Sequence, residues 1–259
     1  MPDVLTEGTK LRLFADDSLV YREINSPQDQ NILQNDLHSL QQWAEKWGMR
    51  FNASKCHIMN IARGKPVTRM YELCNEFLTT VNSAKYLGVI VSDNLQWEEH
   101  INSVTNKANS MLHLVARNLR RCPRMTKVLA YTTLVRPRLE YSCSVWDPYK
   151  QGEIDALEMV NRRAARLVYN KSWRQQGVSP TALLEELGWH TLEERRRQQR
   201  LAMLYRIENH LIAVEPTRLQ RPARQTRGHQ HKYQVIATTH DIVKFSFFPE
   251  NNPRLEFTA

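Results

Sequence analysis

Residues 10–23 read KLRLFADDSLVYRE and place two adjacent aspartates, Asp16 and Asp17, between two short apolar runs. Leu11 and Leu13 before the pair, and Leu19 and Tyr21 after it, recur at every second position, which is typical of short strands. The stretch therefore predicts an antiparallel hairpin whose tight turn carries both aspartates.

The aspartate pair is also a candidate metal site. Neighbouring carboxylates repel one another, so a cation that compensates them is favoured, most simply Mg²⁺. Magnesium ions held by a few carboxylates and by substrate phosphates catalyse nucleotidyl transfer. Aspartate is a common turn residue as well, so two solvated turn side chains are the alternative interpretation of these positions taken alone.

A helix is predicted directly after the hairpin. Ser26 is a good N-cap, Pro27 suits the first helical position and Asp29 supplies an acid in the first turn. Gly48 can adopt the left-handed conformation that ends a helix. One apolar face is expected from residues at steps of three and four, namely Leu33, Leu37, Leu40, Ala44 and Trp47.

Short strands should complete this part of the chain. The predicted strands are Arg50–Asn52 leading to Cys56–Ile61, then Phe77–Val81 and Tyr86–Val91, with a polar turn near Gly64–Pro66. Together with the hairpin and helix they predict an α+β layer, a helix packed on an antiparallel sheet.

The pattern becomes helical beyond Asp93. A long helix is expected from a face containing Trp97, Ile101, Val104, Ala108, Met111, Val115 and Leu119. Further helices are predicted over Met125–Val135 (ended by Pro137), over Glu153–Val168, from Ser179 and Pro180 to Gly188, and from the Thr191 capping box to about His210, with an ordered aromatic loop at Tyr141–Tyr149. The stretch from Ala213 to Lys232 is expected to be extended or disordered. Residues Phe245–Pro249 form an apolar segment near the end, for which docking on the helical bundle and a frayed tail are the two alternatives.

Positive charge is concentrated downstream. Residues 1–96 carry 10 basic and 11 acidic side chains, residues 97–170 carry 12 and 7, and residues 171–259 carry 14 and 9. A basic region beside a near-neutral one suits a protein that grips a polyanion, and an ordinary solvated helical surface is the alternative.

The sequence gives little support for a zinc-binding, membrane or secreted protein. The four cysteines form no CxxC pair, so reduced thiols are expected and a zinc site is not. No run approaches the roughly 18 apolar residues of a membrane helix, and the first residues do not resemble a signal peptide, so an intracellular location is expected.

Several motifs in order resemble one family. The FADD hairpin at 14–17 is followed by WGMRFNASKC at 47–56, KYLGV at 85–89 and WEEHI at 97–101. This series resembles the reverse transcriptases of non-LTR (LINE-like) retrotransposons, which are RNA-directed DNA polymerases. Looser similarity continues through Leu187–Trp189, Thr226–His229 and Phe247–Pro249.

The resemblance implies roles for individual residues of the palm. Asp16 and Asp17 would bind catalytic Mg²⁺, with Phe14 as the aromatic residue before them. Lys55 would lie near the incoming triphosphate and neutralise or protonate the leaving pyrophosphate, although a surface lysine at a strand edge is the alternative. Residues Tyr86, Leu87 and Gly88 would form the primer-grip turn, with an ordinary strand and turn as the alternative.

The resemblance also implies a domain order: a partial palm over 1–96, a helical thumb-like domain over 97–170, and a basic helical extension with a partly disordered tail over 171–259. The thumb-like domain would grip an RNA template paired with a DNA primer, and deoxynucleoside triphosphates would be substrates of the complete enzyme. Phosphate contacts are expected from Arg117, Arg120, Arg121, Arg124, Lys127, Arg162, Arg163 and Arg166. By resemblance, the protein would occur in the cytoplasm and nucleus as a ribonucleoprotein.

A third palm aspartate and the fingers lie well upstream of the hairpin in this family, whereas thirteen residues precede Phe14 here. We therefore expect this chain alone to be inactive in polymerisation, because metal positioning is most of what the reaction asks of the protein. A retroelement remnant that only binds nucleic acid, a decaying element without a role, and an unrelated metal nuclease are the alternatives.

Overall fold

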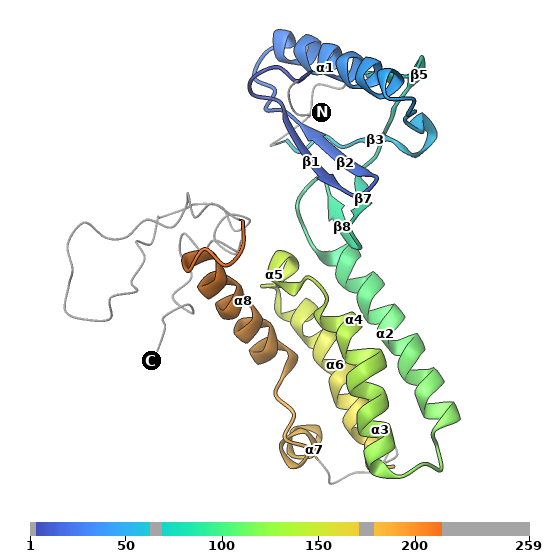
Figure 1. Cartoon of the computed structure of the whole chain (residues 1–259). Coiled ribbons are helices and arrows are strands. Elements are labelled where there is room, and N and C mark those ends of the chain that lie inside the picture. The colour runs from blue at the N-terminus through green and yellow to red at the C-terminus, as the bar shows by residue number, and fades with distance from the viewer. Residues whose placement is uncertain (1–3, 63–68, 171–178, 214–259) are drawn as a thin grey trace, which may run out of the picture. The chain divides into compact units, whose positions relative to one another are not determined.

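The computed structural model describes residues 4–62, 69–170 and 179–213 (Figure 1). The chain divides into two compact units: the first contains residues up to Leu87 and also Val91–Leu95, and the second contains Gly88–Ile90 and continues from Gln96. The predicted turn at Gly64–Pro66, the segment after Ala213 and the Phe247–Pro249 motif lie outside the described residues.

The hairpin of the first unit is confirmed. Strand β1 (Lys10–Phe14) pairs with β2 (Asp17–Tyr21) in antiparallel register, and Phe14 lies opposite Asp17. The loop between them therefore contains two residues, Ala15 and Asp16.

Helix α1 (Pro27–Lys46) begins and ends where the sequence predicts. Ser26 and Asp29 form a reciprocal capping box, and Gly48 has φ +67°, which lets the amide of Met49 donate to the Ala44 carbonyl at 2.8 Å. The prediction that Trp47 belongs to the apolar face is wrong. Trp47 is the C-cap residue and is 64% exposed, because the chain turns away from the helix there.

The later strands are shorter than predicted. Arg50–Asn52 forms no strand and Cys56–Ile61 is reduced to β3 (His57–Ile58), because a 3₁₀ turn, η2 (Ala53–Lys55), intervenes. The remaining strands are β4 (Glu72–Leu73), β5 (Glu76–Phe77), β6 (Thr79–Thr80), β7 (Ser83–Tyr86) and β8 (Val89–Ser92).

The prediction of one antiparallel sheet is also wrong for the described strands. They form separate pairs, β1–β2, β4–β5, β7–β8 and β3–β6, and β3 runs parallel to β6. The side-chain amide of Gln34 on α1 bonds both backbone groups of Glu72 and so supplies the contacts that a neighbouring strand would otherwise make.

The second unit is helical. Its elements are α2 (Glu98–Asn118), α3 (Arg124–Ala130), η3 (Tyr131–Val135), α4 (Arg136–Glu140), α5 (Cys143–Trp146), α6 (Gln151–Val168), α7 (Pro180–Glu186) and α8 (Leu192–Glu208). Helix α2 packs on α4 and α6 (Figure 1), and the core contains Ile101, Ala108, Leu139 and Leu157. The predicted helix starts at Ser179 and Thr191 are confirmed, but only the Thr191 side chain accepts a capping hydrogen bond, from the Glu194 amide.

Pro137 does not end a helix, which corrects the prediction. Residues Tyr131–Val135 form a π turn in which the amide of Arg136 donates to the Tyr131 carbonyl, five residues back. Proline lacks an N–H and its ring clashes with the carbonyl four residues earlier in an α-helix. The wider turn just before Pro137 accommodates both defects, so the helix continues to Glu140.

The aromatic stretch Tyr141–Tyr149 is not a plain loop, because it contains α5 and the fully buried Trp146. Asp147 follows α5 and accepts from Arg196 Nε at 2.8 Å and from Arg200 Nη1 at 2.7 Å. These buried arginines of α8 are thus structural, while Arg197 is half-exposed beside Glu194.

Candidate functional site

The tip of the β1–β2 hairpin presents both aspartates to solvent. Asp16 and Asp17 are exposed, and the neighbouring Phe14 is 64% exposed. Ala15 has φ +52°, at the first turn position where glycine is usual in two-residue hairpins. An L-residue in the left-handed region costs about 1–2 kcal/mol, so the turn holds the carboxylates at the tip at a measurable energetic cost.

Asp16 and Asp17 remain predicted metal ligands, which no finding tests. Among the described residues no group of three His, Cys, Asp or Glu side chains could hold a metal ion. Magnesium commonly keeps water and substrate phosphate ligands beside one or two carboxylates, so the donor chemistry of the tip fits Mg²⁺.

Helix α1 anchors both ends of the hairpin. Buried Asp36 accepts from the Thr6 amide at 2.9 Å and from the hydroxyls of Thr6 and Thr9, just before β1. Arg22, just after β2, donates to the Glu7 carbonyl and pairs with the Asp29 carboxylate at 3.1 Å. The Ser26 hydroxyl, and then Arg22, lower the pKa of Asp29 below its usual value.

Sequence patterns missed Asp36. It lies on the apolar face of α1, one turn from Leu33 and from Leu40, and a lone polar residue in such a stripe was the available signal. Its role as a hydrogen-bond acceptor depends on Thr6 and Thr9, which precede the hairpin and contact that face of α1.

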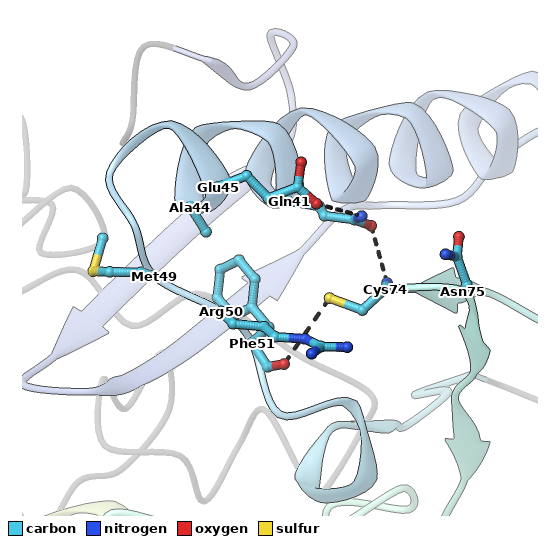
Figure 2. Close-up of a pocket in the computed structure, with 8 residues that line it drawn as sticks. All are labelled: Gln41, Ala44, Glu45, Met49, Arg50, Phe51, Cys74 and Asn75. Carbon is cyan, nitrogen blue, oxygen red and sulfur yellow. Dashed lines mark hydrogen bonds between the residues drawn. The ribbon is translucent and has the colours of Figure 1, made fainter.

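Lys55 is exposed on η2, near two shallow adjoining pockets. Figure 2 shows the first, of about 200 Å³, where Phe51 points towards Ala44 and the amide of Cys74 donates to Gln41 at 3.0 Å. The second pocket extends along Asn52 to Ser54. Neither of these two pockets is lined by Lys55 or by the aspartates.

The predicted primer-grip residues form a tight turn. Leu87 and Gly88 connect β7 to β8 and both have positive φ, +46° and +87°. This is the geometry of a type I′ hairpin turn, which matches the twist of the two strands. A Cβ added to Gly88 would lie 3.0 Å from Cε1 of Tyr141, so an aromatic side chain rests directly on the glycine.

Several predicted phosphate-binding residues gather at one end of the second unit. The end of α2, the start of α3 and the end of α6 meet there, because Lys127 donates both to the Arg120 carbonyl and to Asn170. Arg117, Arg120, Arg121 and Arg124 lie at that end, whereas Arg163 contacts Asn109 in the middle of α2.

These basic groups differ in their availability. Lys127 is 1% exposed and is committed to packing, so it cannot reach a ligand without rearrangement. Arg163 donates to Asn109 on α2, and Arg124 lies over the Tyr169 ring at 4.1 Å and pairs with Glu186. Arg117, Arg120 and Arg121 are exposed, as is Arg124.

Residues 2–91 match the family model for reverse transcriptase (RNA-dependent DNA polymerase), a range that includes the aspartate hairpin. Over these residues the chain is similar to reverse transcriptases. The match extends from the hairpin through η2 to the turn at Gly88, so it covers each palm residue that the resemblance had singled out.

Known relatives confirm the resemblance to non-LTR reverse transcriptases. The chain is 22% identical over 177 residues to the probable RNA-directed DNA polymerase from transposon X-element of Drosophila melanogaster, covering 66% of this chain and 20% of the relative. It is 26% identical over 192 residues to that from transposon BS of the same fly, covering 71% and 21%. The polymerase from mobile element jockey of D. melanogaster is 25% identical over 177 residues, covering 66% and 19%.

The chain thus spans about a fifth of the length of these relatives. No solved structure matches it. Within the described residues, no helix is both long and apolar enough to cross a membrane.

Proposed function

We propose that this reverse transcriptase segment serves in the RNA-directed DNA polymerase of a non-LTR retrotransposon, where it supplies two metal-binding aspartates and a nucleic-acid grip. The exposed aspartate pair, held on a strained two-residue turn inside the family match, is the observation that carries the proposal. The relatives are named as RNA-directed DNA polymerases, which supports the same activity. In this role residues 1–96 are palm, residues 97–170 are thumb, and the protein acts with its RNA in cytoplasm and nucleus.

Asp16 and Asp17 would hold Mg²⁺ at the hairpin tip. When bound there, Mg²⁺ neutralises charge on the phosphates of the nucleotide and of the primer end. The hairpin itself keeps two carboxylates adjacent and exposed, and the Asp36 and Arg22 contacts fix the strands that carry them. Lys55, which is exposed on η2, would offer its ammonium to a triphosphate oxygen.

The basic end of the second unit would bind the backbone of the template–primer duplex. This end contains Arg117, Arg120 and Arg121 with their neighbours on α3 and α6. Guanidinium contacts to phosphate give affinity without sequence preference. Each phosphate neutralised on B-DNA contributes about 0.9 to the slope of log K against log salt.

A second function, nucleic-acid binding without catalysis, is favoured by one observation. Among the described residues, no third metal-ligating side chain joins Asp16 and Asp17 to complete a metal site. A single purified chain distinguishes the two functions. We expect it to bind a template–primer duplex and not to extend the primer, since two ligands position the metal poorly. Primer extension that disappears in Asp16→Asn would instead show that this chain polymerises by itself.

Different substitutions should remove duplex binding and metal binding. Replacing Arg117, Arg120 and Arg121 together by alanine should weaken duplex binding and reduce the salt slope by about one unit per lost contact. A control with the same charge change, Lys10, Lys46 and Arg206 to alanine, should change neither. Mn²⁺ titration followed by electron paramagnetic resonance should show weak binding that Asp16→Asn and Asp17→Asn abolish and Asp155→Asn retains. Wild-type protein without affinity for nucleic acid would refute the proposed grip.

A further inference from the structure

Three apolar side chains on one helix of the second unit face solvent in a row. Met125 is 74% exposed, Leu129 62% and Leu134 49%. They lie on a continuous helical path, because α3 leads directly into η3, and the opposite side of this path packs on α2 and α6 (Figure 1). We call these three residues the α3 stripe. At about 1.5 Å per residue, the stripe runs along roughly 14 Å of helix.

The π turn brings Leu134 into this row. Residues on one face of an α-helix recur at steps of three and four, whereas Leu129 and Leu134 are five positions apart. The turn over Tyr131–Val135 forms its hydrogen bond to a residue five positions back, so a step of five returns to the same face there. Val135, the next residue, is fully buried instead. Single π turns are frequent at functional sites, and this one exposes a leucine that α-helical geometry would turn towards the core.

Positive charge surrounds the α3 stripe. Residues 100–139, which contain most of α2 and all of α3 and η3, include eight Lys or Arg and no Asp or Glu. Arg138 is exposed one turn beyond Leu134, donates to its carbonyl, and pairs with no carboxylate that the structure describes. Carboxylates of the described residues that pair with this segment come from α7 and from the end of α4, in the pairs Glu186–Arg124 and Glu140–Arg136. The surface around the stripe therefore favours a partner with negative charge.

The three exposed side chains decide which kind of anionic partner fits. A nucleic-acid backbone matches the charge but offers no apolar surface to cover leucine and methionine. A second copy of the chain would place two surfaces of like charge against each other, which is unfavourable. Helices that insert into a lipid surface commonly present Trp or Phe, and the stripe has neither. An amphipathic helix with acidic flanks satisfies both requirements, because its apolar residues recur at the spacing of the stripe.

We propose that the α3 stripe is a docking surface for an acidic amphipathic helix of a partner protein. The apolar face of the partner helix covers Met125, Leu129 and Leu134, and its acidic side chains face Arg138 and the other basic groups around the stripe. This interaction goes beyond the polymerase function, since it uses none of the palm residues and needs neither metal nor nucleic acid.

The test titrates a labelled synthetic peptide with the 259-residue chain and follows fluorescence anisotropy. The peptide carries leucines at steps of three and four and glutamates elsewhere, and it should bind the wild type. Leu129→Ser and Leu134→Ser should each raise Kd by about tenfold, because each removes a side chain that the peptide would bury. Leu211→Ser, which changes a 64% exposed leucine beyond α8, is the matched control and should leave Kd unchanged.

Two control peptides and a melting curve separate docking from other effects. A scrambled peptide of the same composition should not bind, and neither should a peptide with lysine in place of glutamate. The serine variants should melt at the temperature of the wild type, since the replaced side chains are exposed. Absence of binding by the acidic peptide, equal binding by the scrambled peptide, or an unchanged Kd in both serine variants overturns the proposal.

Three further measurements would assign the stripe to another occupant and so overturn the proposal. They are loss in Leu129→Ser of binding to vesicles that contain phosphatidylserine, of self-association in sedimentation equilibrium, or of affinity for a template–primer duplex. Each of these properties should instead be the same in the variant and the wild type. Wild-type protein that binds the acidic peptide but no duplex refutes the proposed nucleic-acid grip and leaves the docking surface intact.

Discussion

Asp147 should be the most sensitive single position in the helical unit. One carboxylate compensates two buried guanidinium groups: the Arg196 side chain is 0% exposed, that of Arg200 is 7% exposed, and Asp147 is 21% exposed. Nη1 and Nη2 of Arg196 have no hydrogen-bond partner among the described atoms, so its bond to Asp147 is the main compensation for its charge. The substitution Asp147→Asn keeps the shape and removes the charge.

The expected loss is large because both arginines stay buried. Removing one partner of a buried ion pair costs about 3–5 kcal/mol, and the partial exposure of Asp147 favours the lower end. A loss of about 3 kcal/mol corresponds to a fall in Tm of roughly 12 °C for a unit of this size. Replacing Arg196 by methionine in the same protein should recover part of the loss, since the uncompensated charge is then gone.

Urea unfolding followed by tryptophan fluorescence measures this directly, since Trp146 lies in the same unit. Asp155→Asn on the exposed face of α6 is the control, and its midpoint should match that of the wild type. A change below about 1 kcal/mol for Asp147→Asn, or no recovery on removing Arg196, would show that the arginines are solvated when Asp147 is gone.

Two other outcomes follow from buried polar groups. Burial, and then the charge of Lys107, lower the pKa of His100 from 6.5 to about 4. The unfolded chain therefore binds a proton that the folded chain does not, so stability from this residue is present above pH 6.5 and is lost as pH falls towards 4. His100→Asn, which can still accept from the Ile90 amide, should flatten that part of the stability curve measured by urea unfolding. Asp36→Ala should leave the Thr6 amide without its acceptor, and hydrogen exchange should show faster exchange there and in β1, with α8 unchanged.

The sequence predicted those elements whose signals are local. The β1–β2 hairpin, the capping box at Ser26 and the helix end at Gly48 each depend on residues a few positions apart. Strand lengths were overestimated because β3 extends only as far as its partner β6, some twenty residues away. Pro137 was misread because the π turn that tolerates it leaves no signature in residue type.

The candidate site was predictable in part for the same reason. Asp16 and Asp17 were found from a contiguous motif that is now inside the family match. Lys127 was grouped with exposed arginines, since charge patterns do not reveal that its ammonium is drawn inward by Asn170. Tyr141 carried no motif, and its contact with Gly88 depends on residues more than fifty positions apart.

The π turn at Tyr131–Val135 has a consequence for how relatives should be compared. It accommodates one residue more than an α-helical path would, and each residue advances an α-helix by about 100°. Deleting one residue there would rotate everything downstream by that angle, taking Leu139 out of the core and Tyr141 off the glycine. In an alignment, a relative that lacks Pro137 should therefore show a single-residue gap within 131–135, and the phase of its helix, more than its composition, would determine where its next aromatic residue points.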